Sequence, residues 1–203
     1  MNKILDFYFE YSSPYGYFAS TGIEALAARH DLTIRWHPIL LGPMFKAMGS
    51  APLVNIPLKG EYSRRDFQRT AKLFGIPYTH PDPFPIATVS AARATLYARE
   101  QHPEKLATLV GKLYAGFFAQ GRAINETSVV LDICAESGLN RSAAESALAE
   151  DSLKALLKSE VDHALSQGVF GSPFLIIDNE PFWGFDRFDH IEKWLQATAR
   201  PST

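Results

Sequence analysis

Two serine–proline pairs, one near each end of the chain, constrain the fold more than any other feature. An aromatic run over residues 4–11 leads into Ser13-Pro14-Tyr15-Gly16, and Pro14 suits the first turn of a helix because its missing N–H has no helical partner there. Near the other end, Gly171-Ser172-Pro173 stands directly before another run of strand-forming residues. We expect a fold that sets the second pair, at the start of a late strand, opposite the turn that opens the first helix.

The predicted elements at the two ends indicate an α/β fold. The chain begins as strand, helix and strand, with a connection long enough for a parallel right-handed crossover, and it ends as strand, strand and helix. Asn179-Glu180 is the expected turn between the last two strands, and Asp186 is the expected cap of the last helix. The predicted ranges are 4–11, 15–29 and 33–37 at the start, and 174–178, 181–185 and 187–197 at the end.

The middle of the chain is predicted to be helical. Residues 42–60 are rich in glycine and proline and indicate an irregular loop with a short helix at 44–48. Helices are then predicted over 62–74, 87–101, 104–118, 128–136, 142–149 and 152–166. This order is that of a thioredoxin-like fold with an inserted all-helical domain, in which residues 1–42 and 167–203 form one domain and residues 43–166 the insert. A four-helix bundle does not fit the two aromatic strand runs, and a doubly wound nucleotide fold would need a glycine-rich phosphate turn.

The thioredoxin-like turn that opens the first helix normally carries two cysteines, and here Ser13 and Gly16 stand in their places. Cys134 is the only cysteine of the chain and lies in an apolar helical run, where we expect it to be buried. A dithiol exchange reaction is therefore excluded, and the thiol chemistry of such a site must come from a bound thiol ligand. The single cysteine also favours a reducing, cytoplasmic location.

Composition limits the partners of this chain. The net charge is -2 and the basic residues are scattered, which speaks against a nucleic-acid partner. The N-terminus leads directly into a strand, and no run of about 18 apolar residues suggests a membrane span. The six histidines show no metal-ligand spacing, so no metal site is predicted.

Ser13 is the predicted catalytic residue. Its hydroxyl lies at a helix N-terminus, where an anion is favoured, and it can donate a hydrogen bond to a thiolate. Such a bond contributes about 1.5–3 kcal/mol, which lowers the pKa of a bound thiol by roughly one to two units. The alternatives are a helix cap without further function and, much less favoured because no G-x-S-x-G motif surrounds it, a hydrolase nucleophile.

Three further positions are candidates for ligand binding. The backbone of Ser172, next to Pro173, can pair with an extended peptide if their bond is cis, although an ordinary trans proline at a strand start would have no such role. The backbone N–H groups of Phe185 and Asp186, with the Asp186 carboxylate, suit the head of an α-amino acid, unless Asp186 only caps its helix. Asn55 and Lys59 lie in the irregular loop and can bind an amide and a carboxylate, or can simply be solvated.

Several motifs of the chain resemble those of one enzyme family. They are Phe7-Tyr8-Phe9-Glu10-Tyr11-Ser12-Ser13-Pro14-Tyr15, the stretch from Asn55 to Lys59-Gly60, Phe170-Gly171-Ser172-Pro173, and Phe182-Trp183-Gly184-Phe185-Asp186-Arg187. The chain resembles the 2-hydroxychromene-2-carboxylate isomerases and the related kappa-class glutathione transferases, on the DsbA-like branch of the thioredoxin fold. The likeness covers nearly the whole chain.

The resemblance implies a homodimer that uses reduced glutathione and holds a small aromatic carboxylate between its two domains. It implies that Ser13 holds the thiolate, that the Ser172 backbone binds the cysteinyl part, and that Phe185 and Asp186 bind the γ-glutamyl end. By the same resemblance, Asn55 lies near the thiol and the substrate. Lys59 is a more loosely placed basic residue.

The substrate half of the site departs from the family. Phe45 stands where characterised isomerases carry a substrate-binding lysine, and Lys46 is next to it. Pro83-Phe84-Pro85-Ile86 replaces polar and basic residues. The substrate-binding residues expected here are Phe45, Lys46, Asn55 and Trp183, the last as a pocket wall.

The resulting prediction is a glutathione-dependent isomerase that acts on 2-hydroxychromene-2-carboxylate or a related intermediate of aromatic-compound breakdown by reversible thiolate addition. The alternatives are a kappa-like transferase or peroxidase, which consumes glutathione, and a non-catalytic thiol- or peptide-binding module.

Overall fold

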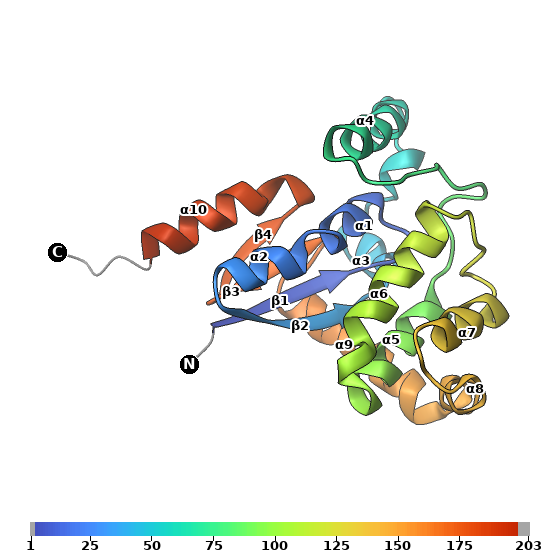
Figure 1. Cartoon of the computed structure of the whole chain (residues 1–203). Helices are drawn as coiled ribbons and strands as arrows, with labels where there is room; N and C mark the ends of the chain where they lie inside the picture. Colours follow the sequence, from blue (N-terminus) through green and yellow to red (C-terminus); the bar gives the residue numbers. More distant parts are fainter. Residues whose placement is uncertain (1–2, 199–203) are drawn as a thin grey trace.

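A four-stranded sheet with the strand order β2-β1-β3-β4 lies at the centre of the computed structural model, which describes residues 3–198 (Figure 1). β1 (Lys3–Phe9) pairs in parallel with β2 (Leu32–Pro38) and antiparallel with β3 (Phe174–Ile177). β4 (Glu180–Trp183) pairs antiparallel with β3 at the outer edge. The predicted α/β fold, with strand–helix–strand at the start and strand–strand–helix at the end, is confirmed. The ends of the predicted first domain, residues 1–2 and 199–203, lie outside the described residues.

The second half of β1 is buried on both faces, which fits its run of three aromatic residues, Phe7 to Phe9. Leu5, Phe7 and Phe9 belong to the main core, where Phe7 and Phe9 stack on each other and pack edge-on against Trp36. Tyr8 points to the opposite face and joins a second core with side chains of helices α3 and α9. The end of this central strand is therefore held rigidly from both sides.

Helices account for most of the chain between β2 and β3. In Figure 1, α5 to α9 gather to the right of and below the sheet, whereas α4 lies at the top. Each predicted helix of this segment is found, with ends that differ by a few residues. The helices are α3 (Leu41–Met48), η1 (Leu53–Asn55, a 3-10 helix), α4 (Lys59–Phe74), α5 (Val89–Gln101), α6 (Pro103–Phe118), α7 (Thr127–Glu136), α8 (Arg141–Ala149) and α9 (Asp151–Ser166).

The helix predicted over 15–29 is two helices, α1 (Pro14–Ser20) and α2 (Ile23–Arg29). Thr21 ends α1, and its hydroxyl donates a hydrogen bond of 2.7 Å to the Phe18 carbonyl. Gly22 then occupies the N-cap position of α2. Side chains that bond nearby backbone carbonyls favour such breaks, and the apolar periodicity on either side hid this one.

Residues 42–60 contain the predicted short helix, which is extended to Leu41–Met48 as α3, but η1 and the start of α4 occupy part of the stretch that was predicted to be irregular. Gly49, at a φ of 62°, ends α3, and Leu58 has a φ of 66°. The Lys59 N–H donates to the Pro57 carbonyl at 2.8 Å, which makes Leu58 the centre of a γ-turn. Lys59 is consequently the first residue of α4 rather than a loop residue.

The end of the chain differs in two details from the prediction. Asp178 and Asn179 have φ angles of 50° and 66°, so the two-residue turn lies one position earlier than expected. A 3-10 helix, η2 (Phe185–Arg187), precedes the last helix, α10 (Phe188–Thr198). Gly184 occupies the N-cap position of η2, and Asp186 caps nothing with its side chain, which corrects the predicted cap.

Candidate functional site

Ser13 lies where the chain leaves β1 and enters α1. It is the N-cap of α1, and its hydroxyl oxygen accepts a hydrogen bond of 3.1 Å from the Gly16 N–H. The same hydroxyl donates its proton to the Ser172 carbonyl at 2.8 Å. Ser13 is thus a helix cap and, at the same time, the point where the two serine–proline pairs meet.

The Ser172–Pro173 bond is cis, and both residues are buried. The Ser172 hydroxyl accepts a hydrogen bond of 3.0 Å from the Glu10 N–H. The Pro173 carbonyl accepts one of 3.1 Å from the Gly184 N–H. This loop therefore joins the end of β1 to the segment that carries η2.

The space beneath the turn is filled by hydroxyl groups. The Tyr114 hydroxyl, fully buried, donates to the Glu10 carbonyl at 3.0 Å. A Cβ atom on Gly16 would lie 2.5 Å from the Tyr114 hydroxyl oxygen and 2.8 Å from that of Ser172. Because real Cβ contacts are longer, any side chain at residue 16, including that of a second cysteine, would require Tyr114 and Ser172 to move.

Glu10 is a buried acid that the motif reasoning did not single out. Its side chain accepts hydrogen bonds from the Ser12 N–H, at 2.8 Å, and from the Thr88 hydroxyl. Burial outweighs both bonds and raises the pKa of this carboxyl to about 7. One signal was available in the sequence, since a lone acidic residue sits between the aromatic residues Phe9 and Tyr11.

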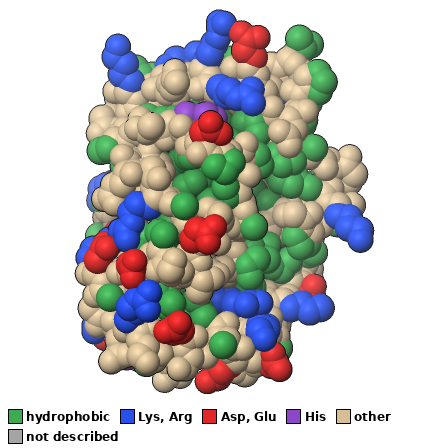
Figure 2. Space-filling view, turned by 90° about the vertical axis from the view of Figure 1, so that its right-hand side faces the viewer, with side chains coloured by type: hydrophobic (Ala, Val, Ile, Leu, Met, Phe, Trp, Pro, Cys, Tyr) green, Lys and Arg blue, Asp and Glu red, His purple; other side chains and the backbone are tan. Residues whose placement is uncertain are grey.

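The proline-rich segment before α5 is fastened to the Ser13 turn. The Ile86 N–H donates to the Ser12 hydroxyl at 3.1 Å, next to the bond between Thr88 and Glu10. Phe84, half-buried in this segment, packs edge-on against the His80 ring with 5.0 Å between the ring centroids. The segment runs along the right-hand side of Figure 1, the side that Figure 2 turns toward the viewer, where hydrophobic side chains form a continuous band.

Two carboxylates approach the turn from the other side. The Tyr15 hydroxyl donates to Asp66 of α4 at 2.5 Å. Burial, this bond and the charges of Asp66 and Asp186 raise the pKa of Tyr15 well above its usual range. Asp66 and Asp186 therefore both lie within electrostatic reach of Tyr15, and sequence reasoning missed Asp66. A pair of carboxylates so placed can accept an ammonium group.

η2 packs against α1, so Phe185 and Asp186 lie on the same side of the molecule as Ser13. The half-buried Phe185 ring packs against Phe74 and Phe18, with centroid separations of 4.8 and 6.0 Å. Asp186 is exposed and forms an ion pair of 2.7 Å with Arg187. As the first N–H groups of a helical turn, those of Phe185 and Asp186 have no partner within it.

The remaining predicted residues lie in η1, α3, α4 and β4. Asn55 and Lys59 are exposed, at η1 and at the start of α4, and in α3 Phe45 is half-buried and Lys46 exposed. Trp183 is 53% exposed, and its ring packs against Phe170. Within residues 3–198, no hydrogen bond, ion pair or ring contact joins any of these five side chains to Ser13.

Cys134 is buried, as predicted, and burial raises the pKa of its thiol to about 11. The described part of the chain contains no group of three histidine, cysteine or acidic residues that could hold a metal ion. Nor does any helix in that part have the length and apolar character needed to cross a membrane.

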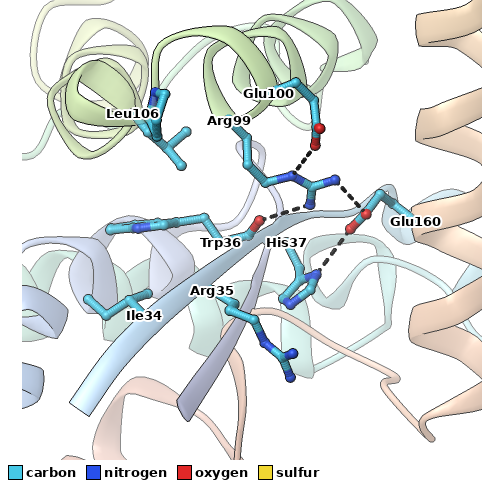
Figure 3. Close-up of a pocket in the computed structure, with 9 residues that line it drawn as sticks. Ile34, Arg35, Trp36, His37, Arg99, Glu100, Leu106 and Glu160 are labelled. Carbon is cyan, nitrogen blue, oxygen red and sulfur yellow. Dashed lines mark hydrogen bonds and ion pairs between the residues drawn. The ribbon is translucent and has the colours of Figure 1, made fainter. Parts of the chain in front are cut away.

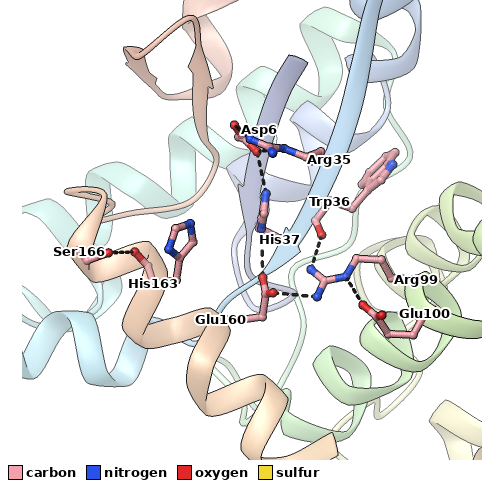
Figure 4. Close-up of polar contacts among 9 residues, drawn as sticks. All are labelled: Asp6, Arg35, Trp36, His37, Arg99, Glu100, Glu160, His163 and Ser166. Atoms are coloured by element: carbon pink, nitrogen blue, oxygen red, sulfur yellow. Dashed lines mark hydrogen bonds and ion pairs between the residues drawn. The ribbon is translucent and has the colours of Figure 1, made fainter. Parts of the chain in front are cut away.

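A second polar cluster lies at the β2 edge of the sheet, beside a hollow of about 540 Å³ (Figure 3). His37 bonds Asp6 at 2.8 Å through one ring nitrogen and Glu160 of α9 at 3.0 Å through the other (Figure 4). Arg35 pairs with Asp6, and Arg99 of α5 pairs with Glu160, each at 2.7 Å. Every charge named here has a partner of the opposite sign, so this cluster links the sheet to the helices and is not the candidate site.

Comparisons with known proteins agree with this geometry. The DSBA-like thioredoxin domain family matches residues 4–196. A 2-hydroxychromene-2-carboxylate isomerase of Sphingobium xenophagum is 31% identical over 199 residues, which cover 96% of this chain and 99% of that protein. Glutathione S-transferase kappa 1 of Caenorhabditis elegans is 26% identical, with 95% and 90% covered. A solved 2-hydroxychromene-2-carboxylate isomerase superposes with a TM-score of 0.87 at 27% identity, covering 97% of this chain and 96% of the other.

Proposed function

The chain belongs to the DsbA-like thioredoxin family, in the group of the 2-hydroxychromene-2-carboxylate isomerases and kappa-class glutathione transferases, and we propose that it is a glutathione-dependent isomerase. One observation carries the proposal: the hydroxyl of Ser13 stands where a redox protein of this fold has its reactive sulfur, and it faces the carbonyl of Ser172 at 2.8 Å. A hydroxyl in this place can stabilise a sulfur that another molecule brings.

The residues around Ser13 fit reduced glutathione. The Ser13 hydroxyl can turn from the Ser172 carbonyl to donate to a sulfur, and the released carbonyl can then accept an N–H from the cysteinyl residue of the ligand. Asp66 and Asp186 can accept the ammonium group of the γ-glutamyl end. The N–H groups of Phe185 and Asp186 can donate to its carboxylate.

When bound, glutathione supplies a thiolate that adds reversibly to an unsaturated carbon of the substrate, so that a bond can rotate before the thiol leaves again. The role of Ser13 is to stabilise negative charge on the sulfur before addition and after release, without a covalent bond of its own. The proposed substrate is 2-hydroxychromene-2-carboxylate or a related aromatic intermediate. Phe45, Lys46, Asn55 and Trp183 are the proposed substrate-binding residues.

Replacement of Ser13 tests the proposal. A hydrogen bond to a charged group contributes about 1.5–3 kcal/mol, so Ser13→Ala should lower the isomerisation rate roughly 10- to 150-fold. Thiolate absorbance of bound glutathione should fall in parallel. Ser20→Ala is the matched control, because this hydroxyl lies at the far end of α1 and, within residues 3–198, donates only to the Tyr17 carbonyl. Equal rates and equal thiolate absorbance in Ser13→Ala and the parent chain would refute the role of Ser13.

The kappa transferase similarity favours a second candidate, a kappa-like transferase or peroxidase that consumes glutathione. The same site would serve both reactions, so stoichiometry separates them. Free thiol that stays constant during turnover supports the isomerase, whereas its loss supports the transferase or peroxidase. Binding of glutathione without turnover of any aromatic substrate would indicate a non-catalytic thiol-binding module.

The proposal includes a homodimer. It also places the chain in the cytoplasm, where reduced glutathione is the main thiol. It also includes the division of the chain into residues 1–42 with 167–203 and the helical insert 43–166, with the substrate held between the two. Sedimentation of the purified chain tests the dimer. Limited proteolysis with and without glutathione tests the division into domains.

A further inference from the structure

Glu10 is the one acidic residue in the stretch 10–16, its side chain is buried, and the mechanism above gives it no task. It is 5% exposed, and no ion pair to it occurs between residues 3 and 198. Its bonds come from a backbone N–H and a hydroxyl, those of Ser12 and Thr88. A buried acid with neutral partners alone is costly to keep ionised, and such groups concentrate at functional sites.

The backbone of Glu10 touches each wall of the site. Its N–H donates to the Ser172 hydroxyl at 3.0 Å. Its carbonyl accepts from the Ser13 N–H and from the Tyr114 hydroxyl, both at 3.0 Å. Any displacement of the Glu10 backbone would therefore also displace Ser13, Ser172 and Tyr114.

Thr88 bonds Glu10 instead of capping its own helix. Thr88 occupies the N-cap position of α5, where a threonine hydroxyl normally accepts a hydrogen bond from the first turn of the helix. Here the side chain makes no such cap and donates to Glu10 instead. Local rules are commonly broken at functional sites.

The charged state of Glu10 acts on the groups around it. It contributes to the raised pKa values of Tyr11 and of Tyr114, and the Tyr114 hydroxyl would lie 2.5 Å from a Cβ on Gly16. Cys134, which also acts on Tyr11, has a raised thiol pKa and is neutral near pH 7. The titratable groups that face Glu10 are thus neutral at that pH, and none of them compensates a negative charge.

We propose that Glu10 is a positioning residue that fixes the Ser13 turn against residues 86–88, and that its carboxyl and a thiolate held at Ser13 compete for a single negative charge. The glutathione ligand in this statement rests on the proposed function. The competition itself is a property of the turn. When Glu10 is protonated, the thiol held at Ser13 has the lower pKa. When Glu10 is ionised, a thiolate would be a second negative charge in the same buried segment, so the pKa of the thiol is higher.

Ser13→Cys provides a reporter that does not depend on glutathione, because it places a thiol on the turn itself. Thiolate absorbance is followed against pH in Ser13→Cys and in Ser13→Cys with Glu10→Gln, with the parent chain subtracted to remove Cys134. Glutamine mimics the protonated acid, since its oxygen can accept from Ser12 and its amide can donate to the Thr88 hydroxyl. The midpoint should fall by about one pH unit in the double variant, because two interacting sites become one.

Asp6→Asn in the Ser13→Cys background is the matched control. It removes the other acid of this stretch of chain, which is paired at the β2 edge, and should leave the thiolate midpoint unchanged. An equal midpoint with and without Glu10→Gln would overturn the proposal. If the double variant does not fold, the Ser13→Cys chain alone decides, since competition requires a broad, two-step curve and a single-site curve contradicts it.

A separate experiment distinguishes a failure of the proposed function from a failure of the Glu10 proposal. If calorimetry finds no glutathione binding to the parent chain, the isomerase proposal falls, while the thiolate titration still tests Glu10. If glutathione binds, the same comparison with Glu10→Gln alone should shift the midpoint of the bound thiol in the same direction.

Discussion

Asp6 and Glu10 are four residues apart in the chain, and their pKa values are shifted in opposite directions. Burial would raise the pKa of Asp6, but hydrogen bonds from His37 and Arg35 outweigh it and lower the pKa to about 2. Glu10 meets only a hydroxyl and a backbone N–H, and its pKa rises to about 7. Burial raises the pKa at both positions, more completely at the buried Glu10 than at the half-buried Asp6, and only Asp6 has charged partners that reverse the sign.

Asp6 belongs to a group of ion pairs that stabilises the fold, whereas Glu10 lies beside the candidate site without a charged partner. The cluster of Asp6, His37, Glu160 and two arginines joins β1, β2, α5 and α9 through opposite charges (Figure 4). The Ser13 turn is held by neutral hydrogen bonds, which leaves it able to receive a charge from a ligand. The two regions should therefore respond differently to mutation and to pH.

The largest expected effect is on stability and lies in the ion-pair cluster. Glu160→Ala leaves His37 and Arg99 without their shared partner, which should lower the free energy of unfolding by about 3 kcal/mol. Urea denaturation measures this loss. Turnover by the folded variant should equal that of the parent chain. Lost activity with unchanged stability would contradict a purely structural role for Glu160.

The second effect is a pH slope of opposite sign for the carboxyl groups of the two regions. The folded-state pKa of Glu10 is raised from 4.5 to about 7, so the unfolded chain releases its proton first and stability falls as pH rises through that window. The difference amounts to about 3 kcal/mol, and Glu10→Gln should remove it. Urea denaturation at pH 5 and pH 8 measures the slope, which should persist in the control Glu136→Gln, since Glu136 is exposed.

The two carboxylates of the cluster should show the reverse behaviour, whereas His37 should act in the same direction as Glu10. The lowered pKa values of Asp6 and Glu160 stabilise the fold above their usual range, and this contribution is lost as pH falls toward 2. The raised pKa of His37, for which bonds to Asp6 and Glu160 outweigh burial, adds stability that is lost as pH rises through it. A flat acid limb below pH 4 in the Glu10→Gln chain would contradict this assignment.

A third, smaller effect is expected at Gly16. Gly16→Ala must displace Tyr114 or Ser172, and overpacking of this kind costs about 1–3 kcal/mol. Because both residues hold the Ser13 turn, activity should fall together with stability, unlike in Glu160→Ala. Gly111→Ala is the control, since a Cβ there meets nothing within 4 Å.

The smallest effect is expected for Thr88→Val, which leaves the Glu10 carboxyl with one hydrogen bond. The loss should be about 1 kcal/mol, and the pKa of Glu10 should rise further. Comparison of the pH slope with that of the parent chain measures both. Thr127→Val, which removes an exposed hydroxyl bonded to Ser90, should change neither.

Local patterns were sufficient for the features in which neighbouring residues act together. The alternation of apolar residues and the two serine–proline pairs predicted the succession of strands and helices at both ends and the placement of Ser172 and Pro173 opposite the turn that carries Ser13. The break at Gly22 and the helical start at Lys59 escaped, because short polar side chains and a γ-turn override periodicity over only a few residues.

The sequence could not reveal partners that only the folded chain brings together. His37 and Glu160 are 123 positions apart, and the bond of Glu10 with Thr88 spans 78. An alternating pattern puts Asp6 and Glu10 on the same face of a strand, yet the strand ends at Phe9 and the turn carries Glu10 inward. Which acid is paired and which is not therefore depends on distant helices.

The absence of a side chain at Gly16 also determines what a second cysteine in this turn would require. A dithiol site needs a second sulfur at residue 16, in the space that the hydroxyls of Tyr114 and Ser172 now fill. A dithiol site in this chain would therefore need cysteines at residues 13 and 16 and, in addition, a rearrangement of the Tyr114 and Ser172 hydroxyls.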